Sequence, residues 1–210
     1  MDKRFAEVRR LLDRYIVEVV ETYGFCPWAK PARLQDEVGV AVLWGTPELD
    51  AWVAAGERLL AEPTTAVAMV IAPELAATPS ELRAIRDRVA LRLPRAGVAD
   101  FHPDAELELA SPARLVPYVR RSPDPLLQLV PLALLDSVRG KPPVAARAEQ
   151  AQMLRGLASP PRGDVADSIA DVNHATVRAQ VAAIGAVLDD IAADRRRSYA
   201  RVGIAIRERA

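Results

Sequence analysis

The sequence predicts an α/β fold with a small, mostly parallel sheet of three to four strands flanked by helices. Two observations predict this class. Short apolar runs of strand length, at residues 38–44, 65–72 and 98–102, alternate with segments of helical periodicity. Each interval between the runs has room for one crossover helix, which is the connection that joins parallel strands. The alternative architecture is a ferredoxin-like α/β sandwich.

The composition and net charge of the chain exclude several classes of protein and of binding partner. The chain has 210 residues, of which 50% are hydrophobic and 27% charged, and its formal net charge is +0. Such a composition is typical of a globular domain and not of a disordered chain. No apolar run reaches the ~18–20 residues of a membrane-spanning helix, and no net charge attracts nucleic acid or anionic lipid. We therefore expect a cytoplasmic protein without a signal peptide, with no nucleic-acid and no membrane partner.

The first predicted helix begins at a cap on Asp2 and ends near Gly24. Apolar residues recur in it every three or four positions, which gives the helix one buried face. Gly24 has the conformational freedom that a helix end needs. Residues 24–37 contain two prolines and are predicted to be a loop that holds Cys26.

Two crossover helices are predicted between the strands. The first spans residues 46–61, with Thr46 as its N-cap and Pro47 at its first position. The second begins after a Thr78 N-cap and carries Glu81 at the capping-box position.

Two more helices are predicted in the second half of the chain. One follows Ser122 as N-cap, has Pro123 at its first position and carries leucines on nearly all sides. The other starts near Asn173, carries a regular apolar stripe and ends in a solvated basic run at residues 195–197.

The domain organisation follows from these elements. Residues 1–139 form the α/β core, the Pro-rich residues 140–172 form a linker or insertion, and residues 173–210 form a C-terminal helix packed on the core. The long amphipathic helices predicted at both ends of the chain are compatible with a homodimer.

Cys26 is the one cysteine of the chain, so no intramolecular disulfide can form. It lies in a loop rather than on an apolar stripe. Its thiol is a candidate nucleophile or redox centre if a neighbour lowers its pKa. The alternative is a buried cysteine that acts as a small hydrophobic side chain.

His102 is predicted at the carboxyl end of the third strand, where open α/β sheets bind ligands. It is a candidate general base oriented by Asp104, or a metal ligand. The alternative is a histidine that is fixed within its loop. His102 and Cys26 are the candidates for holding a metal ion or haem, and Asp104 or Glu106 could supply the further ligands that a metal needs. No spacing in the sequence matches a zinc signature.

Arg120, Arg121 and Ser122 directly precede the helix predicted after Ser122. A helix N-terminus offers unpaired N–H groups, and arginines beside it bind phosphate or carboxylate. The alternative is an ordinary N-cap with arginines paired to nearby acids.

Three motifs together resemble a bacterial family known as domain of unknown function 1415. They are GFCPWA at residues 24–29, FHPD at 101–104 and YVRRSPDP at 118–125. The family carries Cys-Pro-Phe-Ala, Phe-His-Pro-Asp and Asn-Arg-Ser-Pro-Tyr-Pro in the same order, and the resemblance spans about residues 8–190. It has no established activity, so the resemblance implies site residues and not a reaction.

The residues that carry this resemblance belong to all three motifs. They are Cys26, Pro27, His102, Pro103, Asp104, Tyr118, Arg121, Ser122, Pro123 and Pro125. Trp28, Arg120 and Asp124 depart from the pattern, since the family has phenylalanine, asparagine and an aromatic residue there. A shared ligand is therefore not implied.

The sequence predicts an enzyme that acts on a small anionic metabolite. Cys26 is the expected nucleophile or redox thiol, and His102, oriented by Asp104, is the expected base. The expected substrate-binding residues are Tyr118, Arg120, Arg121 and Ser122.

Two alternatives stay open. One is a metal- or haem-dependent protein with His102 and Cys26 as ligands, and the other is a non-catalytic binding or dimerisation module. Cys26, His102 and Arg121 share one pocket only if the loop at residues 24–37 carries the cysteine across the sheet.

Overall fold

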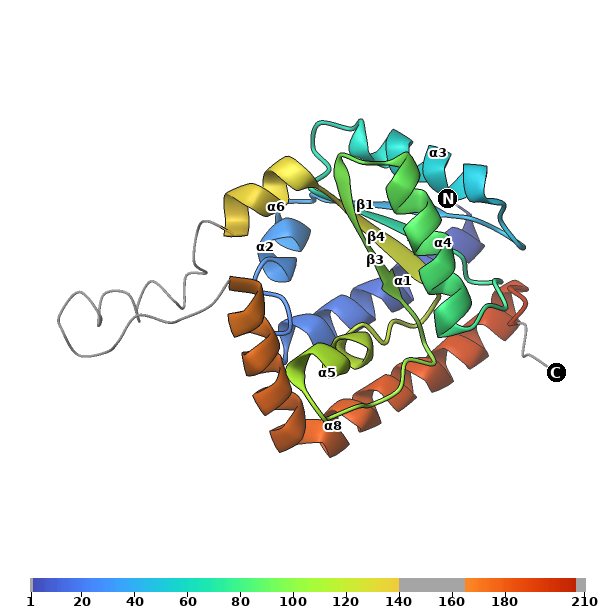
Figure 1. Ribbon diagram of the computed structural model, residues 1–210. Coiled ribbons are helices and arrows are strands. Elements are labelled where there is room, and N and C mark those ends of the chain that lie inside the picture. Colours follow the sequence, from blue (N-terminus) through green and yellow to red (C-terminus); the bar gives the residue numbers. More distant parts are fainter. Residues whose placement is uncertain (1, 140–164, 207–210) are drawn as a thin grey trace.

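The computed structural model describes residues 2–139 and 165–206, and it has the predicted α/β class (Figure 1). A four-stranded mixed sheet has the order β1-β2-β4-β3. The strands are β1 (Val38–Val42), β2 (Val67–Ile71), β3 (Ala96–Phe101) and β4 (Leu126–Pro131). β1 pairs with β2 in parallel, whereas β4 is antiparallel to both β2 and β3. β1, β2 and β3 therefore run in one direction, and the element order differs from the β-α-β-β-α-β order of the ferredoxin-like alternative.

The first helix is confirmed and changes geometry midway. The Asp2 carboxylate caps α1 (Lys3–Arg14) by accepting from the Arg4 N–H at 2.9 Å. The helix continues as the π-helix η1 (Tyr15–Glu21), and Gly24 then takes a φ of 68°. Such wide turns recur at functional sites. The predicted loop that follows contains the short helix α2 (Ala29–Leu34).

The two crossover helices are α3 (Leu49–Leu60) and α4 (Pro79–Arg92). The capping box of α4, with Thr78 and Glu81, is confirmed. The predicted start of α3 is wrong, because its N-cap is Glu48. Gly45 has a φ of 73° and donates its N–H to the Glu74 carboxylate at 2.7 Å. This turn keeps the two residues that follow it outside the helix.

The helix predicted after Ser122 is wrong, because the apolar run forms β4 and only then the helix α6 (Leu132–Arg139). β4 lies between β2 and β3, so both of its edges are paired, and its leucines are buried on both faces of the sheet. A strand of this kind has a continuous apolar run, which periodicity alone does not distinguish from a buried helix. The helix α5 (Pro112–Val119), capped by Ser111, was not predicted.

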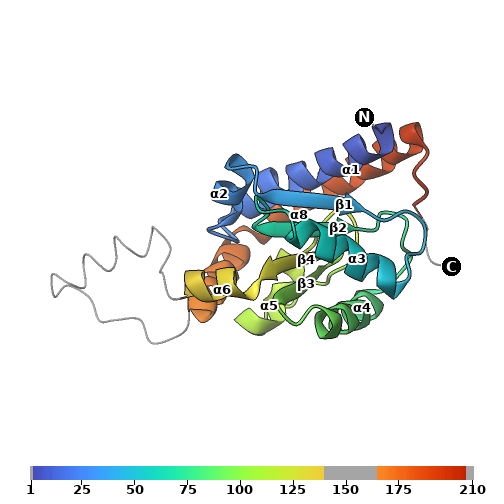
Figure 2. The same cartoon turned by 90° about the horizontal axis from the view of Figure 1, so that it is seen from above.

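The last helix, α8 (Val165–Val202), begins earlier than predicted and turns at Gln180, where φ is −131°. Asn173 is therefore an interior residue of the helix and not its N-cap. Residues 165–172 of the predicted linker are helical, and residues 140–164 lie outside the described residues. Figure 2 shows the second half of α8 alongside α1.

Two apolar cores cover the two faces of the sheet. One lies under α1, η1, α5 and α8, and the other lies under α3 and α4 (Figure 2). α1 and α8 are also joined by ion pairs, since Arg10 and Arg14 each lie 2.7 Å from the Asp194 carboxylate. None of the helices in the described ranges is long and apolar enough to cross a bilayer.

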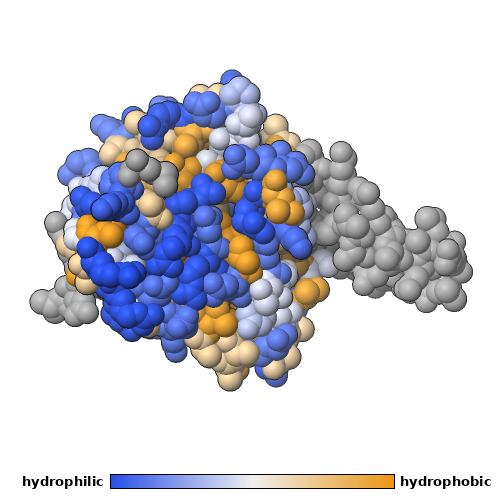
Figure 3. Space-filling model, turned by 180° about the vertical axis from the view of Figure 1, so that it is seen from behind, coloured by the Kyte–Doolittle hydropathy of each residue, from blue (hydrophilic) through white to orange (hydrophobic). Residues whose placement is uncertain are grey.

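The surface carries its apolar side chains on separate elements. The exposed large ones among the described residues are Val17, Leu34, Leu91, Leu107, Leu132 and Val172. The face in Figure 3 is largely hydrophilic, with apolar residues in small separate groups. The homodimer stays a prediction.

Candidate functional site

The candidate residues gather where β4 begins beside the ends of β2 and β3. Leu126, the first residue of β4, pairs with Ile71 and with Phe101. The loop at residues 120–125 therefore lies at the carboxyl edge of the sheet. The His102 N–H donates to the Arg120 carbonyl at 3.1 Å, which joins this loop to the end of β3.

His102 is confirmed at the end of β3, and backbone atoms hold its ring. Its side chain is 4% exposed. Nδ1 accepts from the Asp104 N–H at 3.0 Å, so Nε2 carries the proton and donates to the Ala77 carbonyl at 2.9 Å. The Asp104 carboxylate is 3.9 Å from Nδ1 and mostly exposed. This geometry fits a histidine that ties the loops together better than a general base oriented by Asp104.

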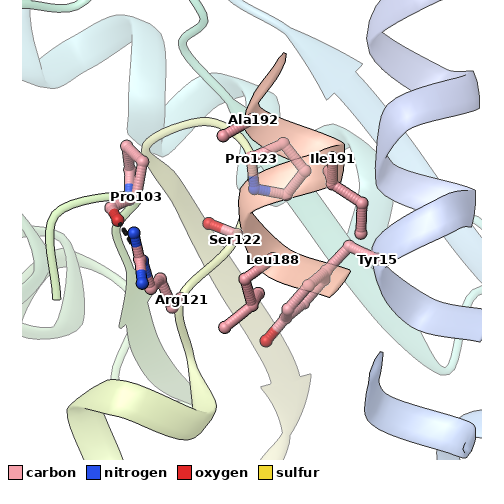
Figure 4. Close-up of a pocket in the computed structure, with 8 residues that line it drawn as sticks. All are labelled: Tyr15, Pro103, Arg121, Ser122, Pro123, Leu188, Ile191 and Ala192. Atoms are coloured by element: carbon pink, nitrogen blue, oxygen red, sulfur yellow. Dashed lines mark hydrogen bonds between the residues drawn. The ribbon is translucent and has the colours of Figure 1, made fainter. Parts of the chain in front are cut away.

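A small cavity lies between this loop, η1 and α8 (Figure 4). Its volume is about 30 Å³, enough for roughly two water molecules or one small charged group. Its lining is mostly apolar and comprises Tyr15, Pro103, Arg121, Ser122, Pro123, Leu188, Ile191 and Ala192.

Arg121 is the charged group of this cavity. Its Nε donates to the Pro103 carbonyl at 2.9 Å, which fixes the plane of the guanidinium (Figure 4). Its Nη2 is 3.7 Å from the carboxylate of Asp189, an exposed side chain on α8. The terminal nitrogens are therefore only weakly engaged.

Ser122 shapes the cavity without offering a free donor. Its hydroxyl donates to the Asp124 carbonyl at 2.6 Å, and its N–H donates to the Arg120 carbonyl at 2.9 Å. The N–H groups of a helix N-terminus, expected after Ser122, are absent because the chain continues into β4.

A buried ion pair between Asp124 and Arg195 ties the loop at residues 120–125 to α8, and it was not predicted. The Asp124 carboxylate accepts from Arg195 Nε at 2.7 Å and from the Tyr199 hydroxyl. Arg195 also donates to the Pro73 carbonyl at 3.0 Å. Burial, together with Asp124, raises the pKa of Tyr199 and keeps it protonated. The run at residues 195–197 reads as a solvated helix end, so nothing in the sequence marks Arg195, whose side chain is 12% exposed.

Cys26 is half-buried and is not among the cavity residues. Burial raises the pKa of its thiol, and hydrogen bonds from the backbone at Trp28 and Ala29 oppose this only in part. The group is a protonated thiol at neutral pH. The structure therefore places Arg121, Ser122 and the loop of His102 together, but not the cysteine.

Tyr15 lines the cavity and is hydrogen-bonded to the end of α5. Its hydroxyl donates to the Val119 carbonyl at 2.8 Å, and burial raises its pKa. The positive charge of Arg120 opposes this effect of burial only in part. Tyr118 is buried, and burial raises its pKa, an effect that the charge of Arg121 opposes only in part.

Within the described ranges, no three His, Cys, Asp or Glu side chains are grouped so that they could hold a metal ion. His102 also has both ring nitrogens engaged by backbone groups. The described residues therefore offer no coordination set around His102 and Cys26.

Comparison of the chain with protein-family models, with curated proteins and with solved structures finds no match.

Proposed function

We propose that the protein binds a small carboxylate-bearing metabolite in the cavity between the loop at residues 120–125 and α8. The observation that carries this proposal is the way in which the guanidinium of Arg121 is held. Its guanidinium is oriented by the Pro103 carbonyl, while its terminal nitrogens have only a long ion pair to Asp189. A guanidinium fork of this kind pairs with a planar carboxylate through two parallel hydrogen bonds.

The lining of the cavity suits such a ligand. Leu188, Ile191 and Pro123 give apolar walls to the cavity that Arg121 lines, and an ion pair is stronger beside apolar walls than in open water. A volume of about 30 Å³ takes the carboxylate group and leaves the rest of the ligand outside. Tyr15 and Ser122 are walls of the site, because their hydroxyls already donate to the backbone.

The geometry supports binding better than catalysis by Cys26 and His102. The thiol has a raised pKa, and both imidazole nitrogens are engaged by backbone groups. In this proposal His102 is a positioning residue, and the proposal contains no catalytic step. The metal or haem alternative has no support from the described residues.

Two further expectations belong to the proposal. A cytosolic location agrees with a chain that has one cysteine and no possible intramolecular disulfide. Membership of the domain of unknown function 1415 family would mean that Arg121 and Ser122 line the same cavity in its other members.

The test is titration calorimetry with butyrate, using butyramide as the neutral analogue of the same shape. We expect saturable binding of butyrate, none of butyramide, and at least a tenfold loss in Arg121→Gln because the charged fork is removed. Arg88→Gln, an exposed arginine on α4, is the matched control and keeps wild-type affinity. Equal affinity in Arg121→Gln and the wild type would overturn the proposal.

A further inference from the structure

Asp189 lies beside the guanidinium group to which we assign carboxylate binding. It belongs to α8 and directly follows Leu188, whose side chain lines the cavity (Figure 4). The side chain of Asp189 is 75% exposed, whereas that of Arg121 is 32% exposed. An acidic group in solvent therefore stands next to the charged residue of the cavity wall.

The two charged groups do not satisfy each other. Arg121 Nη2 is 3.7 Å from Asp189 Oδ1, which is too long for a hydrogen bond. Within residues 2–139 and 165–206, the terminal nitrogens of Arg121 and the carboxylate oxygens of Asp189 make no hydrogen bond. An exposed ion pair of this length adds little to stability, so both groups keep their capacity to pair with a ligand.

The negative charge of Asp189 discriminates between carboxylates. A simple carboxylate on Arg121 brings a second negative charge close to Asp189, and the two charges repel. An ammonium group on the carbon next to the ligand carboxylate replaces this repulsion by attraction, because it pairs with Asp189. The neighbouring acid, Asp190, is already paired with Arg14 at 2.8 Å, so Asp189 is the acidic group that remains for the ligand.

We propose that the ligand of this cavity is a free α-amino acid and that Asp189 is the residue that selects it. This inference rests on the proposed function, because it takes Arg121 as the partner of the ligand carboxylate. The cavity of about 30 Å³ holds the carboxylate, and the ammonium group meets Asp189 on the solvent side. Positive and negative charges then alternate from Arg121 through the two ligand groups to Asp189.

The test compares 2-aminobutyrate with butyrate by titration calorimetry, because the two differ only in the ammonium group. We expect the wild type to bind 2-aminobutyrate at least fivefold more tightly. Asp189→Asn changes an exposed side chain, so the fold is kept; it should abolish this preference and bind butyrate more tightly than the wild type does. Asp190→Asn removes the same charge one residue away and should keep the preference. The amine without a carboxylate, 1-aminopropane, should not bind.

The outcomes separate this inference from the proposed function. Equal affinities for the two ligands, a preference that persists in Asp189→Asn, or binding of 1-aminopropane as tight as that of 2-aminobutyrate would overturn the role of Asp189. Butyrate binding that is lost in Arg121→Gln would then still support the cavity as a carboxylate site. Binding of 2-aminobutyrate that is unchanged in Arg121→Gln would overturn both, because the carboxylate would have another partner.

Discussion

The buried ion pair under the loop makes a quantitative prediction for Asp124→Asn. The Asp124 carboxylate is 4% exposed and accepts hydrogen bonds from Arg195 and Tyr199. An asparagine of the same shape keeps one acceptor oxygen but removes the negative charge. Arg195, which is 12% exposed, is then a buried cation without its counter-ion.

The expected loss of stability is large. Breaking a buried pair by removing one partner costs about 3–5 kcal/mol, because the remaining charge is left uncompensated. A domain of this size is stable by about 5–15 kcal/mol, so the variant loses a substantial part of its free energy of unfolding. The change also loosens the loop of Arg121, because the Asp124 carbonyl accepts the Ser122 hydroxyl at 2.6 Å.

Urea unfolding of the wild type, Asp124→Asn, Arg195→Met and the double variant measures this coupling. The double variant should be more stable than Asp124→Asn alone, because it no longer buries an unpaired cation. A loss below about 1 kcal/mol in Asp124→Asn, within the range of an exposed pair, would refute the reasoning.

Three further predictions concern single side chains. Arg10 and Arg14 lower the pKa of Asp194 to about 2; because the folded value lies below the ordinary one, the stabilisation is present above about pH 4 and is lost as the pH falls toward 2. Asp194→Asn should therefore flatten this acid limb in urea unfolding curves measured against pH, and an unchanged limb contradicts the assignment. His102→Ala should cost about 2–4 kcal/mol, because the Ala77 carbonyl and the Asp104 N–H both lose their partner; a loss below about 0.5 kcal/mol, the effect of an ordinary surface substitution, speaks against a positioning role. Alkylation of Cys26 by iodoacetamide should be slow in the native protein and should still be accelerating with pH above ~8.5, because burial raises the thiol pKa; a rate that levels off below pH 8 would show a thiolate instead.

The elements that were predicted correctly depend on local chemistry. The capping box at Thr78 and Glu81, the Asp2 cap and the left-handed Gly24 each involve residues within a few positions of one another. Interactions between residues so close in the chain can be predicted from the sequence pattern alone. The predicted start of α3 is wrong for the opposite reason, because the Gly45 turn is held by the carboxylate of Glu74, 29 residues away.

The elements that were missed depend on pairing between distant segments. β4 is a strand because it lies between β2 and β3, and an apolar run reads alike in a central strand and a buried helix. The same limit applies to the site. The proximity of Arg120 to His102 follows from the pairing of β4 with β3, and the role of Arg195 follows from a contact with Asp124 across 71 residues.

The most direct test of carboxylate binding is a ¹⁵N-resolved NMR titration of the protein with butyrate. The account predicts saturable shifts of the amide signals of Tyr15, Arg121, Ser122 and Leu188, which line the cavity, and their loss in Arg121→Gln. Shifts that leave these four amides unmoved, or that persist in Arg121→Gln, would contradict the central claim that Arg121 anchors an anion in this cavity.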